Sequence, residues 1–154
     1  MNKFAEKFLL RVILIGLIAT IPHVEVNAQD ENLTRIVKRY LEARRATMLE
    51  KSTTADVDAL LAFYTENVIY EHPRVKARIE GKAKMREGMS SFLGVTKNTK
   101  IATLSFISGV NVVVAEYRVT FKAQEGSTWK AFSRTQVTLF EFEGNKIKRV
   151  GDYW

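Results

Sequence analysis

The sequence predicts an α+β domain in which three helices pack on a curved antiparallel sheet. Apolar residues recur at helical spacing in the first half of the chain and at a period of two from residue 97 onward. Short turns at Ser108-Gly109, Glu125-Gly126 and Gly144-Asn145 separate the later strands. Strands joined by such short connections are antiparallel neighbours, so they form a four-strand meander. Helices on one face of that sheet complete an α+β domain.

The elements follow one another in a definite order. A strongly amphipathic helix is expected over residues 32–51, and Thr54 can cap a second helix. A short strand over residues 67–72 ends at Pro73, and Gly81 precedes a third helix over residues 82–93. The four long strands are expected at 97–107, 110–123, 128–142 and 146–154. Strands this long curl, and a curled sheet closed by a helix leaves a cavity.

Length and composition indicate one globular domain. The chain has 154 residues, of which 46% are hydrophobic and 27% are charged. Cysteine is absent, which excludes a disulfide framework, a thiol nucleophile and a lipoprotein anchor. The domain must therefore be stabilised by its core alone.

The first 28 residues have the layout of a secretory signal peptide. Lys3, Lys7 and Arg11 give a basic start, residues 12–21 are apolar, and Val26-Asn27-Ala28 offers a cleavage site. An uncleaved anchor is the alternative, but the apolar run of about ten residues is short of the roughly 20 that span a bilayer. We expect an exported protein, periplasmic or secreted, with no membrane span after cleavage.

The charge pattern does not indicate a nucleic-acid partner. The net charge is +7, and removal of residues 1–28 takes away three basic and two acidic residues and leaves +6. Basic residues alternate with acids along the chain, and the densest group lies on the first helix. That group is interpreted first as a solvated helix face: Arg35, Lys38, Arg39, Arg44 and Arg45.

Four segments carry a resemblance to a known family. The segments VKRYLEA, FYTENVIYEHP, IEGKAKMREGM and FEFEGNKIKRVGDYW occur in this order over residues 32–154. Together they resemble the SnoaL-like branch of the nuclear transport factor 2-like superfamily, which includes ketosteroid isomerases, polyketide cyclases and limonene-epoxide hydrolases. The resemblance implies that residues 29–154 form a cone-shaped curved sheet with helices over its concave side and a pocket inside. It also implies a homodimer, as in many members.

The resemblance points to three candidate catalytic residues. Tyr40 matches the tyrosine that donates to the oxyanion in ketosteroid isomerases, and His72, before Pro73, occupies the place of their catalytic base. Thr138 stands at their second oxyanion donor. Asp152 matches a catalytic aspartate of limonene-epoxide hydrolases, but Val119 and Tyr117 replace the other two members of that set. Neither mechanism is complete.

Strand alternation selects the remaining pocket residues. If Asp152 faces inward, alternate positions on the same and neighbouring strands face inward too. The expected pocket residues are Tyr117, Val119, Phe121, Arg134, Gln136, Thr138, Val150 and Trp154. No cofactor is expected. A metal site is not expected either, because Glu71 and His72 point to opposite faces and the other histidine lies in the signal peptide.

Three functions remain open from the sequence. The first is a general acid–base isomerase, cyclase or hydrolase acting on a small apolar substrate, in which His72 and Asp152 meet in the pocket with Tyr40 nearby. The second is a non-catalytic ligand-binding or carrier protein, and the third is a protein-interaction module. Tyr40 can instead be a core aromatic, Asp152 a surface acid, and the two pocket residues Arg134 and Gln136 cross-strand wall residues.

We predict cleavage after Ala28. Sequencing the N-terminus of the protein isolated from its host should give Gln29 as the first residue. A soluble cytoplasmic protein that begins at Met1 would contradict this prediction.

Overall fold

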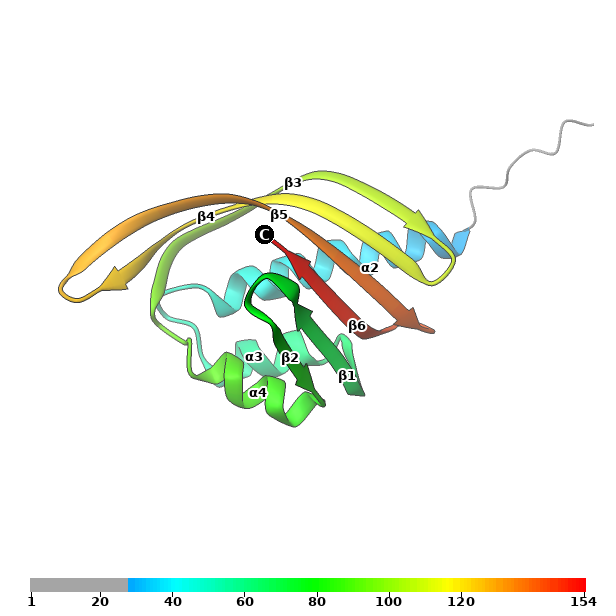
Figure 1. Cartoon of the computed structure of the whole chain (residues 1–154), viewed down its shortest axis with the longest axis horizontal. Coiled ribbons are helices and arrows are strands. Elements are labelled where there is room, and N and C mark those ends of the chain that lie inside the picture. Colours follow the sequence, from blue (N-terminus) through cyan, green and yellow to red (C-terminus); the bar gives the residue numbers. More distant parts are fainter. Residues whose placement is uncertain (1–27) are drawn as a thin grey trace, which may run out of the picture.

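The computed structural model describes residues 28–154, which form three helices and one six-stranded sheet (Figure 1). The predicted signal peptide lies outside the described residues, except for Ala28, which begins the first helix. The elements are α2 (Ala28–Thr47), α3 (Thr54–Leu61), β1 (Tyr64–His72), η2 (Pro73–Val75), β2 (Ala77–Glu80), α4 (Lys82–Ser90), β3 (Thr96–Gly109), β4 (Val112–Glu125), β5 (Thr128–Glu143) and β6 (Lys146–Tyr153). No helix within residues 28–154 is long and apolar enough to cross a membrane.

The sheet is strongly curved and has the strand order β2-β1-β6-β5-β4-β3. The long strands β3, β4 and β5 arch over α2, and α3 and α4 lie further below the arch (Figure 1). The hairpin between β4 and β5 extends beyond the helices. The expected α+β architecture, with three helices on the concave side of a curved sheet, is confirmed.

The N-terminal part of the sheet differs from the expectation. The first strand begins at Tyr64 rather than residue 67, and β2, which the sequence analysis did not predict, pairs with it antiparallel. The sheet is mixed, because β1 pairs in parallel with β6. A four-residue strand such as β2 is too short for its alternation to be recognised.

The core lies between α2 and the concave face of the sheet. Tyr117 and Val119 on β4 are fully buried, whereas Arg118 between them is exposed. The same alternation holds on β5, where Gln136, Thr138 and Phe140 are buried. The core side chains of α2 are Leu33, Val37, Tyr40 and Leu41. The alternation places polar side chains of the long strands on the same face as the core.

Two threonines fix the C-terminal end of α2 to β3. The hydroxyls of Thr96 and Thr99 donate to the carbonyl oxygen of Met48 at 2.8 Å and 2.6 Å. Helix ends leave carbonyl groups without helical partners, and these bonds satisfy one of them at the helix end. The end of α2 is therefore held against the start of the meander, where Met48 and Thr96 line the cavity described below.

The outer face of the meander carries exposed apolar side chains. Ile107 on β3 is 70% exposed, Val137 on β5 is 38% exposed and Tyr153 on β6 is 50% exposed. Exposed apolar groups on one sheet face are typical of a face that binds a partner. The homodimer remains a prediction, and this face is where we expect it to form.

The dimer prediction is tested by light scattering at micromolar concentration. The chain should have the mass of two copies, and Ile107→Lys should shift it to the monomer mass because a buried lysine disfavours the interface. Val110→Lys is the matched control, since Val110 is 81% exposed in the turn after β3. A monomer mass for the unaltered chain would contradict the prediction.

Candidate functional site

A buried carboxylate lies at the centre of a polar cluster on the concave face. Asp152 is fully buried on β6. Its Oδ1 accepts a hydrogen bond from Thr138 Oγ1 at 2.5 Å, and its Oδ2 accepts bonds from Arg44 Nη2 at 3.2 Å and Tyr70 Oη at 3.1 Å. Burial would raise the pKa of this carboxyl, but the charge of Arg44 and the three hydrogen bonds outweigh burial and lower the pKa. The Asp152 carboxylate is therefore charged at neutral pH.

Arg44 supplies the positive charge that balances Asp152. It lies in the last turn of α2, and its side chain is only 18% exposed. Besides Asp152, its guanidinium donates to Tyr117 Oη at 3.0 Å through Nη1. The interpretation of Arg44 as part of a solvated face is wrong, because the helix turns this residue toward the sheet. An arginine suits this position since its planar fork can bond two acceptors at once.

The cluster continues along β4 and β5. Tyr117 Oη and Thr138 Oγ1 are 2.8 Å apart. The amide of Gln136 satisfies its neighbours when its nitrogen donates to Tyr117 Oη at 3.3 Å and its oxygen accepts from Trp154 Nε1 at 3.0 Å and Arg134 Nε at 3.1 Å. Burial raises the pKa of Tyr117 to about 12, so its phenol stays neutral. A continuous set of hydrogen bonds thus joins Arg44 to Arg134.

Tyr40 and Tyr64 form a second polar pair next to this cluster. Tyr64 Oη donates to Tyr40 Oη at 2.8 Å, and both rings are almost fully buried. Burial raises the pKa of both phenols, so both remain protonated at neutral pH. Because Tyr40 accepts the hydrogen bond of Tyr64, its own hydroxyl hydrogen can be donated to another acceptor.

The expected hydrogen bond between His72 and Asp152 is not formed. His72 is 4% exposed, and neither ring nitrogen has a hydrogen-bond partner. Its ring packs edge-on against Trp154, with centroids 4.3 Å apart. Arg44, Tyr70 and Thr138 occupy the carboxylate of Asp152 instead. The catalytic roles of His72 and Asp152 stay a prediction.

A cavity of about 540 Å³ adjoins the cluster. Its walls come from α2, α3, β1, β2, α4, β3, β4 and β5, and most of them are apolar. The lining residues are Tyr40, Arg44, Thr47, Met48, Leu60, Tyr64, Tyr70, Ile79, Met85, Gly88, Met89, Phe92, Val95, Thr96, Phe121, Ala123, Gln124 and Arg134. No aspartate, glutamate or histidine is among these described lining residues.

The predicted pocket residues divide into three groups. Phe121 and Arg134 line the cavity, as does the candidate catalytic residue Tyr40. The buried side chains behind the wall are Tyr117, Val119, Gln136, Thr138, Val150 and Asp152. Trp154 and His72 pack together, and the Arg134 guanidinium lies over the Trp154 ring at 3.2 Å from its centroid. The structure thus brings Tyr40 to the cavity and leaves His72 and Asp152 behind its lining.

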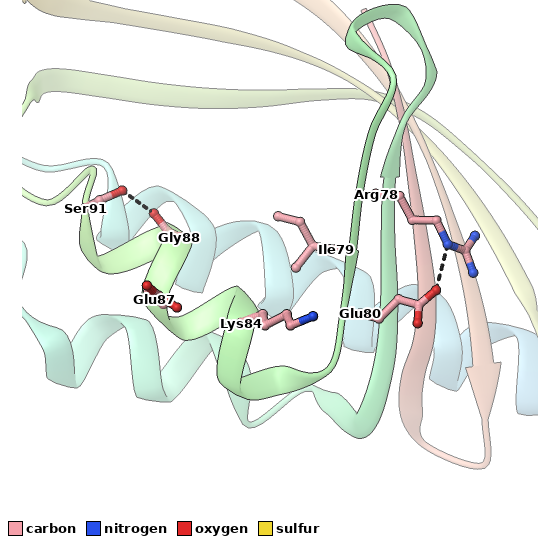
Figure 2. A pocket seen from close by; sticks show the side chains of 7 residues that line it. All are labelled: Arg78, Ile79, Glu80, Lys84, Glu87, Gly88 and Ser91. Atoms are coloured by element: carbon pink, nitrogen blue, oxygen red, sulfur yellow. Dashed lines mark hydrogen bonds and ion pairs between the residues drawn. The ribbon is translucent and has the colours of Figure 1, made fainter.

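A second, more open hollow is lined by residues of β2 and α4 and by Ser91 (Figure 2). Figure 2 shows Ile79 pointing from β2 toward α4, and both Ile79 and Gly88 belong to the linings of the two hollows. The remaining lining is mostly charged, and Arg78 donates to Glu80 at 2.8 Å. Cations and carboxylates are balanced and exposed there, which is typical of a solvated surface.

The cavity therefore presents hydrogen-bond donors to a ligand rather than a base. The guanidinium of Arg44 has five N–H groups, and the bonds to Tyr117 and Asp152 use two of them. The Tyr40 hydroxyl adds a further donor at the same end. Donors of this kind hold a carbonyl or anionic oxygen and stabilise charge that develops on it.

Sequence reasoning missed two members of the site, Arg44 and Tyr70. Arg44 follows Tyr40 by four residues and Val37 by seven, so it lies on the apolar stripe of α2. Tyr70 precedes His72 by two residues on the same strand and therefore shares its face. The helical spacing of Arg44 and the strand spacing of Tyr70 are both visible in the sequence. Arg44 was nevertheless assigned to solvent, because charged side chains are normally exposed.

Comparison with protein families gives one match. The model described as a SnoaL-like domain matches residues 37–150. That range begins within α2 and ends within β6, so it includes every element between them and part of those two. A search of curated proteins gives no match.

Solved structures with this fold come from several bacteria. A candidate polyketide cyclase from Xanthomonas campestris pv. campestris superposes with a TM-score of 0.63 at 20% identity, over 82% of this chain and 93% of that chain. An LEH-like epoxide hydrolase from M. tuberculosis gives a TM-score of 0.65 at 16% identity, over 83% and 81%. A protein with a ketosteroid isomerase-like fold from Catenulispora acidiphila, solved in complex with trimethylamine, gives 0.57 at 16% identity, over 75% and 84%. At these identities the similarity shows the fold alone.

The role of the ion pair in stability is tested with Asp152→Asn. Removing one charge leaves Arg44 buried and unbalanced, so the free energy of unfolding at pH 7 should fall by about 3 kcal/mol. Because the pKa of Asp152 is lowered on folding, its contribution is present above about pH 4 and is lost as the pH falls through the folded-state pKa. Chemical denaturation should therefore show a smaller difference between variant and unaltered protein at pH 3 than at pH 7.

Asp58→Asn serves as the matched control. Asp58 forms an ion pair with Arg86 in which both side chains are about half exposed. Its replacement should change stability little, since solvent screens such pairs. Equal stability of Asp152→Asn and the unaltered protein at pH 7 would contradict the account of the cluster.

Proposed function

We propose that this chain, which belongs to the SnoaL-like domain family, binds a small, largely apolar molecule in the cavity under its curved sheet. The observation that carries the proposal is the cavity itself, about 540 Å³ with mostly apolar walls. The hydrogen-bond donors of Tyr40, Arg44 and Arg134 in its lining form what we call its polar end. Small-molecule sites commonly have this volume, this composition and a few convergent polar groups.

The arrangement of the walls indicates how the ligand lies. Met85, Met89 and Leu60 form an apolar wall contributed by α3 and α4. Methionine side chains adapt to ligands of irregular shape. Tyr40 and Arg44 stand at the polar end, so a carbonyl or other oxygen of the ligand would accept hydrogen bonds there.

Binding accounts for the lining better than acid–base catalysis or protein interaction does. A general base must reach the proton that it removes, and the lining offers no carboxylate or imidazole for this purpose. In an interaction module that does not use the cavity, we would expect the protein's own side chains to fill it. Here they do not fill it.

Acid–base turnover is the second candidate, favoured by the Tyr64–Tyr40 hydrogen bond. This bond leaves the Tyr40 proton free to stabilise a developing oxyanion. The candidate catalytic set proposed from the sequence, His72, Asp152 and Tyr40, would then need an opening of the wall formed by Tyr70. Turnover is supported if Tyr40→Phe abolishes conversion of a ligand found with the purified protein but still binds it.

The binding proposal is tested with N-phenyl-1-naphthylamine, a neutral apolar dye that fluoresces when it leaves water. The dye should bind with one site per chain. Ala123→Trp should weaken binding at least about tenfold, because Ala123 lines the cavity and the indole would fill part of it. Mass spectrometry of the purified protein under native conditions gives an independent check, since a copurified ligand would add to the mass.

Ala131→Trp is the matched control on the same hairpin. Ala131 lies on β5, is exposed and pairs with Lys122. Because residues alternate between the two faces of a strand, Ala131 points away from the face that carries Arg134. Loss of binding in both variants, or in neither, would show that the dye does not occupy the cavity.

A further inference from the structure

The two arginines of the cavity differ in how their charges are balanced. Arg44 is paired with Asp152 at 3.2 Å. Arg134 has no carboxylate within ion-pair distance among the described residues. Two cations and one carboxylate leave one positive charge at the polar end of the cavity.

Arg134 is held in place by uncharged groups. Its guanidinium lies 3.2 Å from the centroid of the Trp154 ring and 5.7 Å from that of Phe121. The Gln136 amide oxygen accepts from its Nε at 3.1 Å. Aromatic rings and an amide fix the orientation of the guanidinium without neutralising it.

The surroundings of Arg134 disfavour its positive charge. Burial and the nearby positive charge of Arg44 both lower the pKa of Arg134. The charge of Asp152 offsets this effect only in part, and no negative residue lines the cavity itself. An anion bound between the two guanidinium groups would relieve their repulsion, because opposite charges attract strongly where water is partly excluded.

We infer that the ligand of this cavity is an amphiphilic monoanion. Its carboxylate or other singly charged group contacts Arg134, and its apolar body lies against the wall formed by Met85, Met89 and Leu60. The inference rests on the proposed binding function and names the ligand class of that same site. One net positive charge matches a single negative charge, so a neutral analogue binds less tightly than the anion.

Two dyes with the same apolar skeleton test the inference. N-phenyl-1-naphthylamine is neutral, and 1-anilinonaphthalene-8-sulfonate carries one sulfonate on the same rings. The unaltered protein should bind the sulfonate at least about tenfold more tightly than the neutral dye. Arg134→Gln should remove this preference, so that the sulfonate loses at least about tenfold more affinity than the neutral dye does.

Arg118→Gln is the control of equal charge change. Arg118 is exposed on β4 and points away from the buried neighbours Tyr117 and Val119. It should leave both affinities unchanged. A loss of sulfonate binding in Arg118→Gln would place the dye on the outer surface and overturn the inference.

The remaining outcomes separate the inference from the function on which it rests. If neither dye binds, the proposed binding function is contradicted. If the neutral dye binds and the sulfonate shows no preference, binding stands and the anionic ligand class is overturned. If Arg134→Gln weakens both dyes equally, Arg134 acts by packing alone, which also overturns the inference.

A competition experiment extends the test to carboxylates. Decanoate should displace the bound neutral dye at a lower concentration than decan-1-ol, since both carry the same chain and only decanoate is charged. Equal displacement by the two compounds would show that the head group does not contact Arg134.

Discussion

The buried ion pair between Arg44 and Asp152 is the interaction on which the site depends. It joins the last turn of the first helix to the last strand. Tyr117 accepts a hydrogen bond from Arg44, and Tyr70 and Thr138 donate to Asp152. A carboxylate buried this deeply would be costly without a cation and hydrogen-bond donors. Arg44 meets that need and at the same time forms part of the cavity wall. The ion pair therefore stabilises the fold and also supplies one of the polar groups that line the cavity.

The ion pair also decides which groups a ligand meets. The Asp152 carboxylate is fully buried and its lowered pKa keeps it ionised, while Tyr70 and Arg44 stand between it and the cavity. The ligand therefore meets donors: a guanidinium, a phenol supported by Tyr64, and the second guanidinium of Arg134. This chemistry favours the recognition of oxygen atoms over the removal of protons.

The fold was predicted more completely from the sequence than the site was. Period-two alternation correctly placed Tyr117, Gln136 and Thr138 on one face of the long strands, because alternation is a local property of a strand. The parallel pairing of β1 with β6 could not be read from the pattern, since the two strands are about 80 residues apart in the chain. The partner of Asp152 could not be predicted from the pattern either, because it depends on the same long-range arrangement of the chain. Arg44 was assigned to solvent from its charged neighbours, although its spacing from Val37 and Tyr40 placed it on the buried stripe.

The position of a bound dye tests the central claim most directly. A crystal structure of the protein with 1-anilinonaphthalene-8-sulfonate should show the aromatic rings between Met89 and Phe121 and the sulfonate within hydrogen-bond distance of Arg134. Such a complex would place an amphiphilic anion at the end of the cavity that the Arg44–Asp152 pair defines. A dye bound on the outer face of the sheet, with the cavity holding only water, would contradict the account.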